Sequence, residues 1–154
     1  MDYKARAEQA IAQYGVRGQY ANAAALTSYK SMRGAEHATE AGDCAVRALH
    51  MATALSYSEA HALLARHGRK HGNATSFAAV YVPAAEEAGL KRHATRAKTL
   101  GQFLKAEGAR GVWVVGMTGH FATYVDGKNV SDQADSGART RVYSQYRYIW
   151  KAAD

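Results

Sequence analysis

Cysteine and proline are scarce in this sequence, with one of each among 154 residues. A single cysteine excludes a disulfide within the chain, and it excludes a structural zinc site built from several cysteines. Long apolar runs are also missing, since no stretch approaches the roughly 20 residues that a membrane-spanning helix needs. The chain begins without the apolar core of a signal peptide, so we expect no signal peptide and no membrane partner.

Acidic residues are few as well. The chain has 13 of them against 20 lysines and arginines, which gives a formal net charge of +7. Such a charge favours anionic partners such as nucleic acid, cell wall or an acidic protein surface. Basic residues cluster at 66–71 and 91–98. Because no recognised nucleic-acid motif accompanies them, we interpret both clusters as solvated surface rather than as a nucleic-acid interface.

The expected organisation is one globular unit preceded by a helical arm. The length fits a single domain, and 47% apolar with 21% charged residues is ordinary for a globular protein. Residues 2–13 and 20–32 are rich in alanine and long polar side chains, which favours two weakly apolar helices. We therefore assign residues 1–34 to an N-terminal helical arm suited to docking on a partner, and residues 35–154 to the globular domain.

Helices are expected in the first part of this domain and strands in the second. The segment after Gly42 is expected to be helical, and residues 56–59 have the pattern of a capping box that begins the next helix. Residues 76–89 have a helical composition, with Pro83 breaking the helix or restarting it at its first turn. Further elements are expected as a short strand within 91–98, a helix at 99–108, and strands at 111–116, 119–125, 128–132 and 142–150. Helices followed by an antiparallel sheet indicate an α+β fold.

Cys44 is the candidate nucleophile. It follows Asp43 at the start of an apolar helix, where unpaired backbone N–H groups and the positive end of the helix dipole favour a thiolate. The negative charge of Asp43 opposes this effect, so the thiol needs a base as a partner. The alternative interpretation is that Cys44 is a small buried apolar residue, as most free cysteines are.

His120 is the candidate base, because it alone of the seven histidines begins a strand of the expected sheet. If Gly127 takes the left-handed position of a three-residue turn, His120 faces Asp132 across the hairpin, with about 5 Å between Cβ atoms. If the turn has two residues, Gln133 takes that place. Asn129 lies too far along the strand to reach the ring. We therefore rank Asp132 first as the residue that orients the imidazole, then Gln133, then Asn129.

These features resemble the papain-like cysteine peptidase clan. Residues 42–49 together with 119–132 are most similar to its compact bacterial and phage members, and the aspartate before the cysteine is similar to that of its cell-wall endopeptidases. The resemblance implies a papain-like fold, in which the nucleophile helix packs on a C-terminal antiparallel sheet. It also implies a triad of Cys44, His120 and Asp132 that cleaves a peptide, isopeptide or amide bond through a thioester.

The oxyanion hole departs from the pattern of the clan. Many members have a glutamine six residues before the cysteine, and Ala38 stands at that position. Thr39 or Glu40 then becomes the candidate donor beside the Cys44 backbone N–H, and Glu40 qualifies only as a protonated acid. The alternative function is a catalytically weak or inactive papain-like fold that serves as a structural or binding component, for instance of a phage particle.

The resemblance implies a peptide, protein or peptidoglycan substrate, no cofactor, and a location in the bacterial cytoplasm or a phage particle. His67 and His71 are one helical turn apart, a spacing that can bind a metal ion, but no carboxylate lies near them in the sequence. We therefore expect no metal site there.

Overall fold

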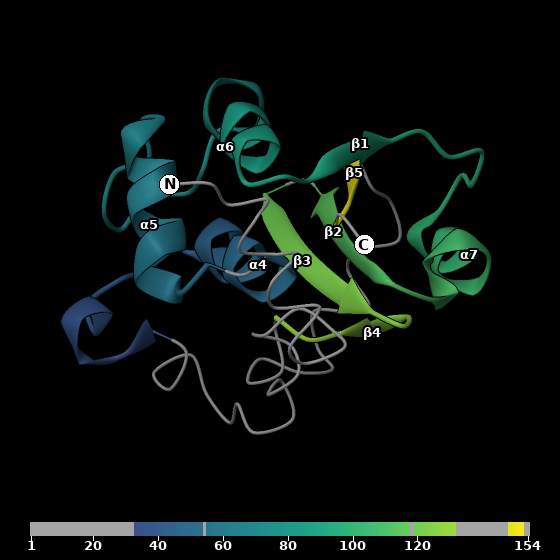
Figure 1. The fold of residues 1–154 in the computed structure, drawn as a ribbon, viewed down its shortest axis with the longest axis horizontal. Helices are drawn as coiled ribbons and strands as arrows, with labels where there is room; N and C mark the ends of the chain where they lie inside the picture. Colours follow the sequence, from purple (N-terminus) through teal and green to yellow (C-terminus); the bar gives the residue numbers. More distant parts are fainter. Residues whose placement is uncertain (1–32, 54, 118, 132–147, 153–154) are drawn as a thin grey trace.

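The computed structural model describes residues 33–53, 55–117, 119–131 and 148–152. Most of the predicted N-terminal arm, with its two helices, lies outside this part of the chain. The described residues form helices packed on a five-stranded antiparallel sheet with the strand order β1-β5-β2-β3-β4 (Figure 1). The predicted α+β class is therefore confirmed.

The helices lie at the positions that the sequence predicts, with shorter bounds. The described part of the chain contains α4 (Cys44–Ala52), α5 (Tyr57–Arg66), α6 (Val82–Glu87) and α7 (Leu100–Lys105), with a π-helical stretch (Phe77–Tyr81) directly before α6 and short 3-10 turns at Ala35–His37 and Glu107–Ala109. The strands are β1 (Lys91–His93), β2 (Val112–Met117), β3 (His120–Val125), β4 (Lys128–Asn129) and β5 (Tyr148–Lys151).

Local sequence signals fix where two of the helices begin. Ser56 accepts a hydrogen bond from the Glu59 backbone N–H, and the Glu59 side chain accepts one from the Ser56 N–H, so the predicted capping box at the start of α5 is confirmed. Pro83 lies in the first turn of α6, as predicted. Proline has no N–H to donate into the preceding turn, which is why the π-helical stretch ends and an α-helix restarts there.

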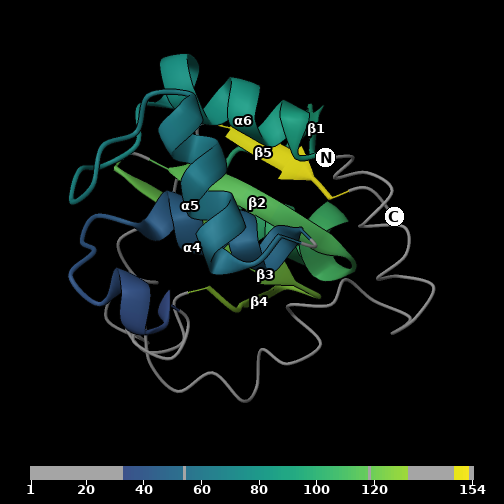
Figure 2. The same cartoon turned by 60° about the vertical axis from the view of Figure 1, so that its left-hand side comes forward.

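The sheet separates two apolar clusters. Helices α4, α5 and α6 cover one face, where their side chains pack on Val112, Val114 and Trp150. Helix α7 covers the other face, against alternate residues of the same strands such as Trp113 and Val115. Figure 2 shows α4 and α5 in front of the sheet, and the contacts place α4 between α5 and β3. Helix α4, which begins at Cys44, is thus held on both sides.

The hairpin between β3 and β4 has a two-residue turn, so the prediction of a three-residue turn is wrong. Val125 pairs with Lys128 and Tyr124 with Asn129. Asp126 and Gly127 both have positive φ, 48° and 81°, which is the conformation of a type I′ turn. For a two-residue turn, the residue expected opposite His120 from the sequence is Gln133 and not Asp132.

The described residues include no helix with both the length and the apolar character needed to cross a membrane.

Candidate active site

Cys44 is the first residue of α4 and is partly exposed. The backbone N–H groups of a first helical turn have no partner within the helix, so they and the helix dipole favour negative charge on the sulfur. One helical turn after Cys44, α4 is tied to the sheet, because Thr123 Oγ1 in β3 donates to the Ala48 carbonyl at 2.6 Å. The position of the thiol is therefore set by the packing of α4 on β3.

His120 begins β3 and is 2% exposed. Its side chain is hydrogen-bonded to Cys44, and the backbone N–H of Phe121 donates to the same sulfur. Burial raises the pKa of the Cys44 thiol, but the His120 hydrogen bond and charge, the Phe121 N–H and the nearby charge of Arg47 together bring this pKa below its usual value. The structure thus brings together Cys44 and His120, the candidate nucleophile and the candidate base.

Asp43 does not cap α4 with its side chain. Its carboxylate instead accepts hydrogen bonds from Arg33 Nε at 2.8 Å, from Arg33 Nη2 at 2.7 Å and from the Tyr57 hydroxyl at 2.7 Å. Burial opposes ionisation of this carboxyl, but the bonds from Arg33 and Tyr57 and the charge of Arg47 lower its pKa to about 2. Because these donors compensate the negative charge, Asp43 opposes the Cys44 thiolate less than the sequence suggests.

Arg47 lies one helical turn after Cys44 and is 3% exposed. Its Nη1 donates to the Ser131 carbonyl at 3.1 Å, and its Nε lies 3.5 Å from Asp43 Oδ1. This side chain links α4 to the end of the hairpin that carries His120, and it supplies positive charge beside the thiol. This role was not predicted from the sequence, although an aspartate and an arginine four residues apart at the start of a helix are a recognisable pair.

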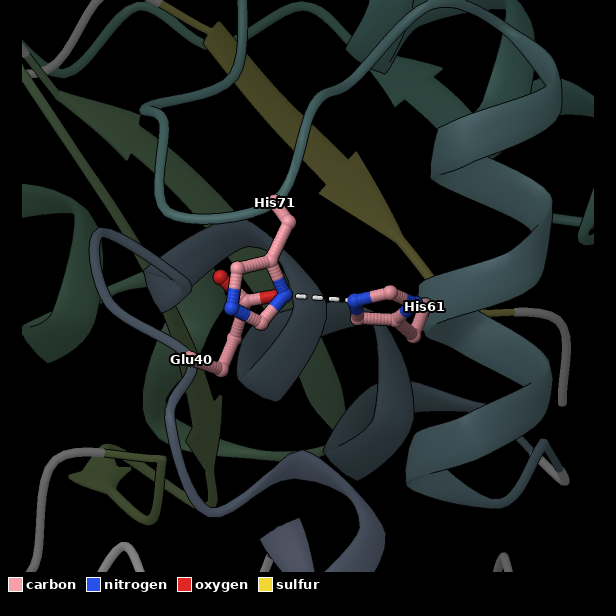
Figure 3. Close-up of side chains that lie close together, drawn as sticks. All are labelled: Glu40, His61 and His71. Carbon is pink, nitrogen blue, oxygen red and sulfur yellow. Dashed lines mark hydrogen bonds and ion pairs between the residues drawn. The ribbon is translucent and has the colours of Figure 1, made fainter.

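Glu40 is a hydrogen-bond acceptor and not the donor that an oxyanion hole needs. Its buried carboxylate accepts from Arg69 Nη1 and Nη2 at 3.1 and 2.9 Å, from the backbone N–H groups of Ala41 and Gly72, and from His61 (Figure 3). Burial raises the pKa of the Glu40 carboxyl, but the Arg69, Gly72, Ala41 and His61 bonds outweigh it and hold this pKa far below its usual range. The protonated acid that the sequence analysis required is therefore strongly disfavoured.

The other candidates for the oxyanion hole and the metal site are also placed by the structure. Thr39 is exposed, and its Oγ1 lies 3.2 Å from His71 Nε2. His67 and His71 do not converge on one point, because His67 Nε2 lies 3.7 Å from Glu87 while His71 Nδ1 lies 3.2 Å from Glu40. Their sequence spacing therefore does not translate into a shared metal site.

Tyr81 brings an unexpected polar group to the neighbourhood of the thiol. The residue is fully buried, its ring stacks on that of Phe121 at 4.0 Å between centroids, and its hydroxyl has no hydrogen-bond partner among the described residues. Burial and the charge of Cys44 raise the pKa of this hydroxyl far above its usual value. No motif in the sequence marks this residue.

Asp132 and Gln133, the candidates for orienting His120, lie outside the described residues. Asn129 pairs with Tyr124, well along the hairpin from His120, as the sequence predicts.

No protein-family model, curated protein or solved structure matches this chain. The assignment of a function therefore depends on the geometry of Cys44, His120 and the residues around them.

Proposed function

We propose that the chain is a cysteine peptidase or amidase with a papain-like arrangement of its catalytic groups. The observation that carries this proposal is the hydrogen bond between Cys44, at the start of α4, and His120, at the start of β3, together with the lowered thiol pKa. A thiol beside an imidazole at the N-terminus of a helix is the arrangement that activates a cysteine for attack on a carbonyl.

In this mechanism His120 accepts the thiol proton and the Cys44 sulfur attacks the carbonyl carbon of the substrate. The backbone N–H of Cys44 is one donor to the oxyanion that forms. As the tetrahedral intermediate collapses, His120 gives its proton to the departing amine and a thioester remains. His120 then removes a proton from water, which attacks the thioester and releases the acid. A peptide, protein or peptidoglycan stem is the substrate class, and the third catalytic group is assigned to Asp132 or Gln133.

The first test measures the reactivity of the thiol. We expect iodoacetamide to alkylate Cys44 at neutral pH at least tenfold faster than it alkylates the unfolded chain in urea, because more of the folded thiol is ionised. His120→Ala should remove most of this acceleration. His50→Ala is the matched control, since His50 is a helix histidine whose Nδ1 faces the Leu55 carbonyl at 2.8 Å and not the sulfur. A native rate equal to the unfolded rate would contradict the proposal.

The second test measures turnover. Wild type and Cys44→Ala are incubated with purified peptidoglycan and with a peptide library, and the products are identified by mass spectrometry. We expect new amine and carboxyl termini only with wild type. In the same assay, Asp132→Ala and Gln133→Ala show which side chain orients His120, because loss of the orienting group should lower kcat with the fold retained.

A binding or structural role is the second candidate function. The ionised state of Glu40 favours it, because this residue cannot donate to an oxyanion. Fast alkylation of Cys44 without turnover of any substrate would support this role. We expect fast alkylation together with turnover.

A further inference from the structure

Three side chains from separate parts of the chain converge beside the segment that leads into α4. They are Glu40 in that segment, His61 in α5 and His71 in the loop after α5 (Figure 3). His61 Nε2 lies 2.6 Å from Glu40 Oε2, and His71 Nδ1 lies 3.2 Å from the same oxygen. One ligand atom of each residue lies within 4.8 Å of the other two. The three groups therefore need only small shifts to surround one ion.

The donor set suits a transition metal ion. Two imidazole nitrogens and one carboxylate oxygen are ligands that zinc uses in proteins, and three protein ligands leave a fourth tetrahedral position for water. Calcium and magnesium prefer sites made of oxygen atoms, so the two histidines select against them. The neutral imidazole and the ionised carboxylate are the ligating forms.

Neighbouring groups hold the carboxylate in place. Glu40 Oε1 accepts from Gly72 N–H at 2.7 Å, from Arg69 Nη2 at 2.9 Å and from Ala41 N–H at 3.0 Å. These donors orient the group so that Oε2 faces both imidazoles. The second nitrogen of His71 lies 3.2 Å from Thr39 Oγ1, which fixes the orientation of that ring as the outer contacts of metal-binding histidines commonly do.

The cluster is open to solvent on one side. The side chain of His71 is 55% exposed and that of His61 is 19% exposed, whereas the Glu40 side chain is fully buried. An ion can therefore enter past His71. Arg69 Nη1 also donates to Oε2, at 3.1 Å, and its positive charge opposes a dication. For this reason we expect weaker binding than at a structural zinc site.

We propose that Glu40 Oε2, His61 Nε2 and His71 Nδ1 bind a divalent transition metal ion of the zinc class, with water as the fourth ligand. Neither Cys44 nor His120 is a ligand, so the site does not depend on the proposed peptidase activity. A bound ion would join the segment before α4 to α5 and to the loop that follows α5. From the sequence, His71 was weighed as a ligand only together with His67, and no site was expected there; in the fold His61 and Glu40 lie beside it instead.

The test is a titration of the full, untagged chain with zinc chloride by isothermal titration calorimetry. All variants carry Cys44→Ala, so that the thiol cannot bind the metal. We expect saturation at one ion per chain. His61→Ala and His71→Ala should each weaken binding at least tenfold, because each removes one of three ligands. His67→Ala is the matched control, since its ring faces Glu87 and not the cluster, and its affinity should be unchanged.

A second measurement identifies the ligands without the use of Glu40 variants, which risk unfolding because this carboxylate is buried. Cobalt(II) chloride replaces zinc, and a tetrahedral site with two imidazoles should give visible absorption bands that disappear in His61→Ala. Circular dichroism confirms that each variant is folded. Absence of saturable zinc binding, or zinc binding that both histidine variants leave unchanged, would overturn the site.

Discussion

Among individual residues, Tyr81 combines complete burial with a hydroxyl that has no partner among the described residues. Such a group loses its hydrogen bonds to water on folding and regains none. We expect Tyr81→Phe to raise the free energy of unfolding by about 1 kcal/mol, measured by urea denaturation. A loss of stability instead would indicate that the hydroxyl is paired with bound water.

Tyr57→Phe is the matched control, and its effect should have the opposite sign. The Tyr57 hydroxyl donates to the ionised Asp43 carboxylate at 2.7 Å. Hydrogen bonds to charged groups contribute about 1.5–3 kcal/mol, so the loss of this one should lower the free energy of unfolding by that order. The same chemical change therefore distinguishes a satisfied from an unsatisfied buried hydroxyl.

The Asp43 carboxyl should make stability depend on pH in the acid range. Its pKa in the folded protein is about 2, against an ordinary value of 3.8. A lowered pKa contributes stability above the unfolded value, and this contribution is lost as pH falls from about 4 through about 2. The difference between the folded and unfolded pKa values of Asp43 corresponds to about 2 kcal/mol of folding stability.

We expect the free energy of unfolding of wild type to exceed that of Asp43→Asn at pH 6, and the gap to shrink towards pH 2. Urea denaturation at several pH values measures it. The difference between the two curves isolates Asp43 from other acids, such as Glu40, whose pKa is also lowered. A gap that stays constant from pH 6 to pH 2 would contradict the assignment.

At the scale of single elements, the features that could be predicted from the sequence are those that depend only on neighbouring residues. The capping box before α5 and the proline in the first turn of α6 need only neighbouring residues, and both predictions are confirmed. The turn of the hairpin was predicted wrongly because Asp126-Gly127, although typical of a two-residue type I′ turn, is also compatible with a three-residue turn that has glycine in the left-handed position. The choice is made by a distant contact: Asp126 Oδ1 accepts from Gly111 N–H at 2.8 Å, and Asp126 N–H donates to the Gly111 carbonyl at 2.9 Å.

The turn conformation gives a prediction for a pair of glycines. Gly127 has φ of 81°, and a Cβ there would meet no atom closer than 3.9 Å, so the cost of a side chain comes from the backbone alone. We expect Gly127→Ala to lower the free energy of unfolding by about 1–2 kcal/mol. Gly101 lies in α7 without positive φ and with space for a Cβ. Gly101→Ala should therefore raise stability by about 0.5–1 kcal/mol. Equal effects at both positions would argue against the type I′ turn.

At the scale of the whole molecule, the candidate pair of Cys44 and His120 and the buried ion pairs differ in how far they could be predicted from the sequence. Cys44 was recognisable as the lone cysteine at a helix start, and His120 as the histidine that begins a strand. The partners of Glu40 were not, because Arg69 lies 29 residues away and the segment between them carries no pattern that brings the two together. A buried ion pair is specified by tertiary packing, which depends on all the elements at once.

The net charge of the chain gives a final prediction, about anionic reagents. With +7 overall and with Arg47 and His120 beside the sulfur, the potential at Cys44 should be positive and should attract anions. Iodoacetate carries a negative charge and iodoacetamide does not, although both alkylate the same thiolate. We expect the iodoacetate rate to fall roughly threefold to tenfold between about 0.01 M and about 1 M salt, as the Debye length shrinks from about 30 Å to about 3 Å.

The iodoacetamide rate should stay nearly constant over the same range, because a neutral reagent is not steered. Arg47→Met should reduce the salt dependence for iodoacetate, whereas Arg96→Met, in the segment between β1 and α7, should change it much less. Rates for the urea-unfolded chain supply the intrinsic ratio of the two reagents. If iodoacetate and iodoacetamide showed the same salt dependence, the potential at the thiol would not be positive, and the net charge of the chain would not steer anions to Cys44.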